Sequence, residues 1–349
     1  MKAAVITELR RPPVVQELPD PTPGPGDAVI RVEACGVCRS DWHFWQGDWT
    51  WLGLEPSLPM VLGHEFGGVV EAVGSGVRSF KPGDRVTVPF HLACGRCEYC
   101  YSGRSNLCGQ GIYGAALHGG YASKVLIPNA DANLVRLPEG VDALSAAALG
   151  CRYMTAYHGV VDRAGIRPGE WIAVFGAGGV GLSAVQIANA VGARVIAVDI
   201  SDEKLARAKE EGAEAVVNAA TAPAPEAIQE ITGGGAAVTV DALGSPNTAV
   251  PALLSLVKGG RHVQIGLTGR DEKGLIPLPV DVITFRELQV IGSLGCPTTS
   301  YKGLLDLVAT ERLNPRRLVS RTIALEEVGD TLAAMSDFNT VGFTVITQF

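Results

Sequence analysis

The sequence predicts an α/β protein in which a doubly wound parallel sheet is inserted near the end of a β-rich domain. Three observations lead to this class. The 349 residues suit two domains of ~150 residues each. Short apolar segments separated by Gly- and Pro-rich turns fill roughly the first 150 residues. From about residue 170, strand-like and helix-like segments alternate instead.

The β-rich part begins with strand-like segments separated by turn sequences. The strands are predicted in "AVIRVEACGV", "FGGVVEAVG" and "DRVTVPF", and the turns in "PTPGPGD" and "FKPGDRV". The last stretch of the chain returns to this mixed character, with a helix in "YKGLLDLVATERL" and a terminal strand in "VGFTVITQF". We therefore predict one domain from residues 1–151 and 294–349, and an inserted domain from residues 152–293.

The inserted domain opens with "EWIAVFGAGGVGLSAVQIANAVGARVIAVDI", which is a strand, a glycine-rich turn, a helix and a second strand. The helix is expected to bury one face, which carries Val180, Ala184, Ile187, Ala188 and Val191. Further helices are expected near residues 203–211, 225–231 and 247–257, and strands near 214–217, 237–242 and 261–266. This alternation is typical of a parallel sheet covered by helices.

The composition excludes several classes of function. The net charge of −7 argues against a nucleic-acid partner, which would require a basic surface. No apolar segment reaches the ~18 residues that span a membrane, and from the first residues, which lack a long apolar segment, we expect no signal peptide. We therefore expect a cytoplasmic protein. Its eight cysteines then suggest metal binding or catalysis rather than disulfides.

A glycine-rich turn joins the first strand and helix of the inserted domain. Its residues are Gly176, Gly178, Gly179, Val180 and Gly181. Such glycines permit a tight turn and close approach to a pyrophosphate, which the free N–H groups of the helix N-terminus can bind. Asp199 ends the next strand, where a carboxylate accepts from ribose hydroxyls of NAD and repels the 2′-phosphate of NADP. The alternative is an ordinary βα turn, but this context favours dinucleotide binding.

Four closely spaced cysteines form a second motif, "CGRCEYCYSGRSNLC". They are Cys94, Cys97, Cys100 and Cys108. Four thiolates at this spacing can close a tetrahedral zinc site that leaves no position open for chemistry. A DNA-binding zinc module and an iron–sulfur cluster are the alternatives, and the first finds little support in the charges nearby.

Three further candidate ligands lie far apart in the chain: Cys38, His64 and Cys151. Two cysteines and one histidine, with a fourth position open, form a known catalytic zinc set. Each residue also has a simpler interpretation, because Cys151 could pack in a core and His64 could sit in a turn. Cys38 could form a dithiol with Cys35. Spacing alone leaves these alternatives open.

Over essentially its full length the sequence resembles the zinc-containing medium-chain alcohol dehydrogenases. The resemblance is carried by "GVCRSDWH", "GHEFGG", "GDRV", the four-cysteine loop, "GCRYMTAYHG", "GAGGVG" and "VDI". It implies a GroES-like catalytic domain with an inserted Rossmann domain, and NAD with two zinc ions per chain. The four-cysteine loop then matches the structural zinc site of that family.

The resemblance also implies roles for the residues of the catalytic domain. Cys38, His64 and Cys151 match the ligands of the catalytic zinc. Cys35 matches no ligand of the family, so we expect it to pack in the core. Glu65 would lie behind the zinc as a transient ligand, and Asp41 would orient His64. Ser40 and His43 would relay the substrate proton to solvent.

For the cofactor, the resemblance implies contacts beyond the glycine turn and Asp199. Arg39 would face the pyrophosphate, Lys204 the adenosine ribose and Thr155 the nicotinamide. Gly266 and Leu267 complete the expected cofactor set. Phe343 stands where many family members carry a phosphate-binding arginine. From this departure we expect weak NAD binding, and tighter NADH binding in Phe343→Arg.

The expected activity is the NAD-dependent, reversible oxidation of primary or secondary alcohols to aldehydes or ketones. The alternatives are a polyol or sugar dehydrogenase of the same superfamily and a non-enzymatic cofactor-binding relative. Trp42, Trp45, Trp49 and Trp51 would lie near the site entrance and suit apolar or aromatic substrates, unless they only pack the loop. The partners expected are this small-molecule substrate and further copies of the chain in a homotetramer.

Overall fold

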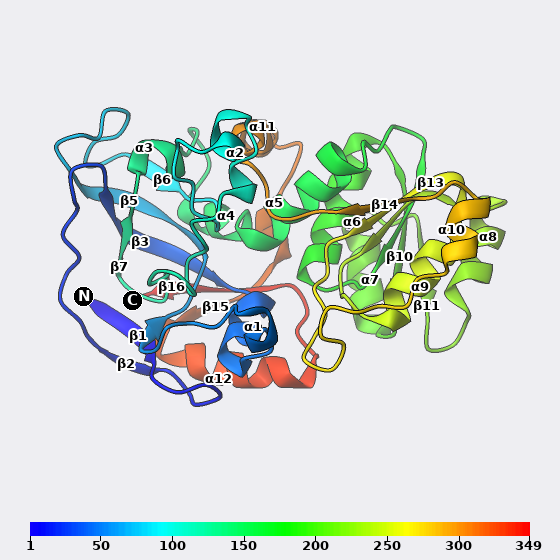
Figure 1. Cartoon of the computed structure of the whole chain (residues 1–349), viewed down its shortest axis with the longest axis horizontal. Helices are drawn as coiled ribbons and strands as arrows, with labels where there is room; N and C mark the ends of the chain where they lie inside the picture. The colour runs from blue at the N-terminus through cyan, green and yellow to red at the C-terminus, as the bar shows by residue number, and fades with distance from the viewer. The chain divides into compact units, whose positions relative to one another are not determined.

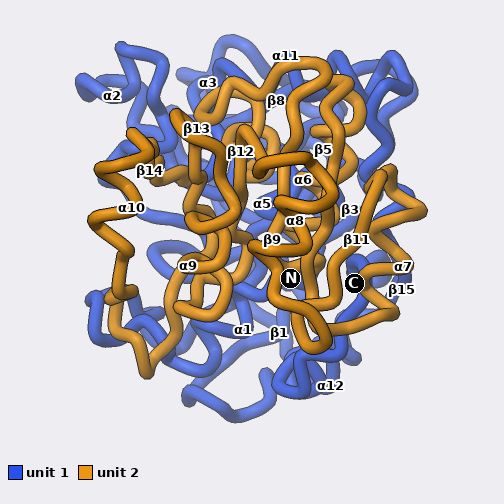
Figure 2. The backbone as a smooth tube through the Cα atoms, turned by 90° about the vertical axis from the view of Figure 1, so that its right-hand side faces the viewer, with its two compact units in different colours: residues 1–154, 295–349 blue, residues 155–294 orange.

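The computed structural model describes all 349 residues, and the chain divides into two compact units (Figure 1, Figure 2). Unit 1 comprises Met1–Met154 and Gly295–Phe349, and unit 2 comprises Thr155–Leu294. The α/β class is confirmed, with a β-rich unit and an inserted unit built on a parallel sheet. None of the helices combines the length and apolar character needed to span a lipid bilayer.

Unit 1 is built on two sheets. The larger has the order β15-β16-β3-β5-β6-β8, with β7 also paired to β3, and the smaller has the order β2-β1-β4. The strands of the larger sheet are β3 (Ala28–Val37), β5 (Glu65–Val73), β6 (Arg85–Thr87), β7 (Lys124–Ile127), β8 (Val135–Arg136), β15 (Val319–Ala324) and β16 (Phe343–Gln348). Those of the smaller are β1 (Lys2–Ile6), β2 (Val14–Glu17) and β4 (Met60–Val61). All pairs are antiparallel except β15–β16.

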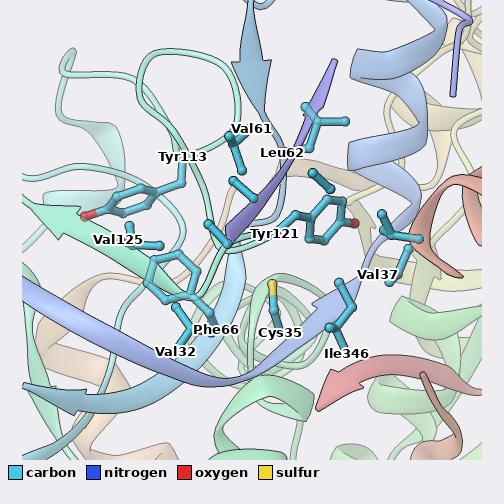
Figure 3. Close-up of a cluster of buried hydrophobic side chains, with 14 of the residues drawn as sticks. Val32, Cys35, Val37, Val61, Leu62, Phe66, Tyr113, Tyr121, Val125 and Ile346 are labelled. Carbon is cyan, nitrogen blue, oxygen red and sulfur yellow. The ribbon is translucent and has the colours of Figure 1, made fainter. Parts of the chain in front are cut away.

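The core of unit 1 explains Cys35, the first cysteine of the Cys-x-x-Cys pair. Its side chain is fully buried, and its sulfur points into a cluster that contains Phe66, Tyr121 and Ile346 (Figure 3). The thiol donates only to the carbonyl of Gly36, at 3.7 Å. Cys35 is therefore a packing residue, and the two cysteines do not form a dithiol.

Short helices connect the strands of unit 1. They are α1 (Arg39–Gln46), α2 (Glu98–Tyr101), α3 (Ala130–Asn133), α4 (Ala143–Ala148), α5 (Cys151–Tyr157), α11 (Thr298–Ala309) and α12 (Val328–Ala334), with α5 running on into unit 2. Helix α1 follows β3 at Cys38 and ends at Gly47, whose φ of +68° suits glycine. Trp42, Phe44 and Trp45 anchor it because all three are buried. This anchoring fixes the first turn of α1, which carries the candidate site residues.

Unit 2 is a six-stranded parallel sheet with the order β11-β10-β9-β12-β13-β14. Its strands are β9 (Trp171–Phe175), β10 (Arg194–Asp199), β11 (Ala215–Asn218), β12 (Ala236–Asp241), β13 (Leu256–Gln264) and β14 (Gln289–Gly292). Its helices are α6 (Gly179–Val191), α7 (Asp202–Glu210), α8 (Ala224–Thr232), α9 (Pro246–Leu254) and α10 (Val280–Phe285). Since the strand order reverses between β9 and β12, dinucleotides bind at the carboxyl ends of these strands in folds of this kind.

Two expectations about unit 2 are corrected. The helix predicted over residues 247–257 ends at Leu254, because Leu256 pairs with Ala236 and begins β13. The helix over residues 179–191 does not bury one face only, since residues 181–188 are all buried. It packs on β9 and β10 and is also covered by α7 and the π-helix His158–Arg163.

Candidate functional site

The three dispersed ligand candidates of unit 1 meet at one point. The ligand atoms of Cys38, His64 and Cys151 all lie within 4.8 Å of one another. Cys38 joins β3 to α1, His64 directly precedes β5, and Cys151 is the first residue of α5. The fold thus brings together three residues that are distant in sequence.

Asp41 holds the imidazole of His64 in one orientation. Its Oδ1 lies 2.8 Å from His64 Nδ1 and also accepts from the backbone N–H of Gly63. Its Oδ2 accepts from the backbone N–H of Cys38 and from the Tyr121 hydroxyl. His64 Nδ1 therefore carries the proton, and Nε2 presents its lone pair. That Nε2 is buried and has no hydrogen-bond partner in the protein.

These three residues fit a zinc ion. The hydrogen bond from Cys151 holds the pKa of Cys38 well below its usual value, and the same contact raises the pKa of Cys151 well above its own. Two thiols this close repel each other once both are ionised, so a cation between them is required for both to serve as thiolates. Two sulfurs and the orphaned imidazole nitrogen make a zinc donor set with one position open to substrate.

Glu65, expected as a further ligand, lies outside this group. Its carboxylate is bound instead by Arg152, whose Nε and backbone N–H both donate to Oε1 at 3.0 Å, while a second guanidinium nitrogen donates to Oε2. Burial raises the pKa of Glu65 to about 6, although Arg152 opposes this shift, so the carboxylate is ionised at neutral pH. Because Arg152 uses both oxygens, the structure pairs Glu65 with a guanidinium rather than with the ligand group.

The predicted proton relay lies on α1, and the structure adds a member to it. Ser40 Oγ lies 3.8 Å from Cys38 Sγ. His43 Nδ1 lies 2.8 Å from a carboxylate oxygen of Asp48, and its ring stacks on Trp49 at 4.8 Å. Burial lowers the pKa of His43, while Asp48 opposes the shift. Sequence reasoning missed Asp48, although it lies within one helical turn of the end of α1.

Arg39 has its partners within unit 1. Its guanidinium donates to the carbonyl of Met335 at 2.7 Å and lies over the rings of Phe338 and Trp42, at 4.2 and 4.7 Å. The expected contact between Arg39 and a pyrophosphate therefore remains a prediction.

The tryptophans near α1 mostly pack the loop. Trp42, Trp45 and Trp49 are buried, and the indole N–H groups of the first two donate to Ser336 and to the carbonyl of Arg11. Of the four tryptophans expected at an entrance, Trp51 alone is exposed, at 40%. Trp42, Trp45 and Trp49 therefore pack the loop, which was the alternative to a place at the site entrance. The aromatic residue next to the ligands is Phe90, whose ring lies edge-on to His64 at 5.8 Å.

The four-cysteine loop also gathers its sulfur atoms. Cys97 Sγ lies 3.6 Å from Cys100 and 3.8 Å from Cys108, and Cys94 lies 4.0 Å from Cys100. A tetrahedral zinc with Zn–S bonds of ~2.3 Å places its sulfurs about 3.8 Å apart. A backbone N–H from Arg96 lowers the pKa of Cys94 to about 6, which favours a thiolate. The loop therefore fits a closed structural zinc site.

In unit 2 the glycine-rich turn leads from β9 into α6. Gly176 has a φ of +91°, and a Cβ on Gly181 would collide with the Gly176 carbonyl. A Cβ on Gly178, the N-cap of α6, would meet open space. The N–H groups of Gly179 and Val180, which open the helix, belong to its N-terminal anion-binding end. The turn thus has the backbone freedom and the open space that a pyrophosphate requires.

Asp199 lies at the end of β10, beside this turn. Its Oδ2 accepts from the backbone N–H of Ala177 at 2.7 Å, and its Oδ1 accepts from Ile200 and Ser201. These bonds hold the carboxylate at the carboxyl edge of the sheet, where the ribose of a dinucleotide binds in folds of this kind. Lys204 lies nearby on α7, and its expected contact with the ribose remains a prediction.

Three other cofactor candidates occupy defined positions. Gly266 follows β13, and a Cβ there would strike the backbone of Leu243 and Gly244, so only glycine fits. Leu267 is 52% exposed. The hydroxyl of Thr155, on α5, is buried without a hydrogen-bond partner in the protein, which suits a contact with the polar edge of a nicotinamide. The residues present therefore fit a dinucleotide.

Phe343 is not a vacant phosphate-binding position. Its ring is fully buried in β16, and the guanidinium carbon of Arg152 lies 3.8 Å from the ring centre. An arginine at position 343 would place a second buried cation against Arg152. The expectation that Phe343→Arg tightens NADH binding stays a prediction, and the structure adds that such an arginine would lie beside the buried guanidinium of Arg152.

Comparison with known proteins gives consistent matches for both units. Residues 24–139 match the model of the alcohol dehydrogenase GroES-like domain, and residues 179–310 match that of zinc-binding dehydrogenases. The chain is 40% identical over 337 residues to an alcohol dehydrogenase of Geobacillus stearothermophilus, covering 96% of each chain. It is 36% identical over 354 residues to an NAD-dependent alcohol dehydrogenase of Sulfurisphaera tokodaii, covering 99% of each. Among solved structures, alcohol dehydrogenase TADH from Thermus sp. ATN1 matches with a TM-score of 0.92 at 32% identity, covering 100% of both chains.

Proposed function

This chain belongs to the zinc-containing medium-chain alcohol dehydrogenase family, and on that premise we propose that it is an NAD-dependent alcohol dehydrogenase. Its substrates would be primary or secondary alcohols of apolar or aromatic character, oxidised reversibly to aldehydes or ketones. The observation that carries the proposal is the group Cys38, His64 and Cys151, with the buried, unpartnered His64 Nε2 aimed into it. Such a site has no evident use in a protein that only binds a dinucleotide.

The two metal sites have different proposed roles. When bound by Cys38, His64 and Cys151, zinc would supply the Lewis acidity that makes an alcohol ionisable near neutral pH. Zinc can lower the pKa of water from 15.7 to ~7, which corresponds to about 12 kcal/mol, whereas a positioned general base supplies about 3–5 kcal/mol. The closed four-cysteine site would hold its own loop in place.

The residues of α1 would remove the proton from the alcohol. Ser40 lies next to Cys38 and offers a hydroxyl that can accept and donate at the same oxygen. His43 is partly exposed, at 18% of its side chain, and can deliver the proton to solvent. Because Asp48 binds Nδ1, the Nε2 atom of His43 is the one that exchanges protons. His43 thus carries the proton away and does not replace the metal.

Unit 2 would select the cofactor. Asp199 presents a fixed carboxylate to a ribose and repels a 2′-phosphate, and the following residues, Ile200, Ser201 and Asp202, offer no cation to bind one. This arrangement supports a preference for NAD over NADP.

A panel of substrates tests the proposal. Initial rates would be measured for aliphatic primary, secondary and benzylic alcohols and for polyols, with NAD and with NADP, before and after treatment with a chelator. We expect NADH formation from simple alcohols that is lost with the metal. Turnover of polyols alone would favour the sugar dehydrogenase alternative, and NADH binding without turnover of any substrate would favour a non-enzymatic protein.

A further inference from the structure

The pair formed by Glu65 and Arg152 is the feature of unit 1 that the proposed reaction does not use. The carboxylate receives three hydrogen bonds, two on Oε1 and one on Oε2, all of them from Arg152. Glu65 is fully buried and Arg152 is 5% exposed. The two residues therefore form a bidentate ion pair from which solvent is excluded.

The surrounding chain is shaped around this pair. A Cβ on Gly36 would overlap Oε2 of Glu65, and a Cβ on Gly150 would overlap the Glu65 side chain itself. On the other side, the guanidinium of Arg152 rests on the ring of Phe343, with 3.8 Å between the guanidinium carbon and the ring centre. Two glycines and a buried aromatic ring thus leave room for one arrangement of the two charged groups.

The pair also lies directly beside the metal ligands in the chain. Glu65 follows His64, and Arg152 follows Cys151. A carboxylate is itself a zinc ligand, binding at ~2.0–2.2 Å, so a free Glu65 here would compete with substrate for the open position. Arginine is suited to prevent this, because its fork binds both carboxylate oxygens and it stays charged at any relevant pH.

We propose that Arg152 is a positioning residue that holds the Glu65 carboxylate away from the metal and so keeps the fourth coordination position open for substrate. In this chain Glu65 then acts as a fixed counter-ion rather than a transient ligand. The proposal rests on the proposed function for its kinetic consequence, whereas its spectroscopic consequence requires only that the site binds a metal.

The experiment compares cobalt-substituted forms of the full-length protein. The variants are Arg152→Met, the double variant Glu65→Gln/Arg152→Met, and Arg194→Met as a matched control. Arg194 likewise pairs with a glutamate, Glu214, and stacks on an aromatic ring, Trp171 at 3.9 Å, but in unit 2 and half exposed. Visible absorption reports the ligands of cobalt, because its bands shift in wavelength when one ligand replaces another. The four-cysteine site contributes equally to every variant and cancels in difference spectra.

In Arg152→Met the released carboxylate should occupy the fourth position of the catalytic cobalt in place of water, and the visible bands of that cobalt should shift in wavelength. Because Glu65 then competes with substrate, KM for the alcohol should rise about tenfold with a smaller change in kcat. The double variant should restore the parent spectrum, since an amide binds zinc-type metals poorly. Arg194→Met should leave both readouts unchanged.

A folded Arg152→Met protein with the parent spectrum would overturn the proposal, as would a double variant whose spectrum stays altered. If Arg152→Met does not fold, Arg152→Lys takes its place, because lysine keeps a charge but cannot bind both oxygens; an unchanged spectrum there would also refute the role. Should the parent oxidise no alcohol, the proposed function fails, while the cobalt spectra still decide the role of Arg152.

Discussion

At the scale of single residues, Asp48 illustrates how a side chain outside every motif can tune the proposed chemistry. Its carboxylate orients His43 and opposes the lowering of the His43 pKa by burial. Asp48→Asn removes that opposition, so the pKa of His43 should fall further. Alcohol oxidation needs the unprotonated imidazole, and the rise of kcat/KM with pH should therefore move to lower pH.

The same variant should lose about tenfold in kcat, less than the ~10²–10⁴-fold that a complete general base supplies, because His43 remains but is poorly oriented. Asp162→Asn is the control, since Asp162 makes an equivalent contact with His158, at 2.7 Å, outside the relay. Full pH profiles of both variants check this. A profile of Asp48→Asn that coincides with the parent would exclude Asp48 from the relay.

Asp199 should determine the preference for NAD. Its carboxylate is fixed by three backbone N–H groups, and losing its bonds to a ribose should cost about 1.5–3 kcal/mol, roughly 10- to 100-fold in kcat/KM with NAD. Asp199→Gly should lose this much with NAD and gain with NADP. Asp202→Asn, a few residues away on α7, should behave like the parent. The assignment fails if the parent uses both cofactors equally well.

At the scale of elements, the two cysteine-containing segments should each account for one zinc ion. Cys38→Ser alters the turn between β3 and α1 and should reduce the zinc content from two to one per chain, with activity lost and NADH binding retained. Cys35→Ala is the matched control, because Cys35 lies in the same segment but points into the core. Elemental analysis would contradict the assignment if Cys38→Ser kept both ions.

Cys97→Ser should also remove one zinc ion, but with a different consequence. It opens the loop formed by residues 94–108, whose sulfur atoms are otherwise spaced for a closed site. A loss of about 2 kcal/mol would lower Tm by about 4–8 °C in a unit of this size. Calorimetry beside zinc analysis checks this. A Tm equal to that of the parent, with one ion missing, would show that the loop needs no metal.

At the scale of the whole molecule, we propose a homotetramer in which strand β14 takes part in contacts between copies. This strand is an edge of the unit 2 sheet, and Val290 on it is 45% exposed. Phe285 and Val280 on the preceding helix α10 are 84% and 64% exposed. An unpaired edge beside apolar side chains is suited to pairing with a second copy.

Val290→Lys should weaken this contact, because a charged side chain on an edge strand disfavours pairing. Light scattering after size-exclusion chromatography should show four chains in the parent and a smaller assembly in the variant. Lys258→Glu serves as the control, since Lys258 lies on the neighbouring strand β13 rather than on the edge. A monomeric parent would refute the assembly.

Short-range signals in the sequence were sufficient for the fold class, the glycine turn and the four-cysteine set. The φ of +91° at Gly176, the helix start at residue 179 and the acid at the end of β10 depend on residues close together in the chain. The four-cysteine loop likewise depends only on residues that are close together in the chain, between positions 94 and 108. Even the dispersed ligands Cys38, His64 and Cys151 could be found, because each lies in a motif of the family that the sequence resembles.

Tertiary structure decided what no local pattern contains. Arg152 and Glu65 are 87 residues apart, and only the fold brings the Arg152 side chain against Glu65 on β5 and Phe343 on β16. For the same reason the sequence did not reveal that Phe343 is buried beneath the guanidinium of Arg152. The helix predicted to continue to residue 257 ends at Leu254, because Leu256 pairs with Ala236 of strand β12. Local patterns determine which elements form and which ligands they carry, but the partner of a buried charge is set by contacts between elements, which a linear pattern does not encode.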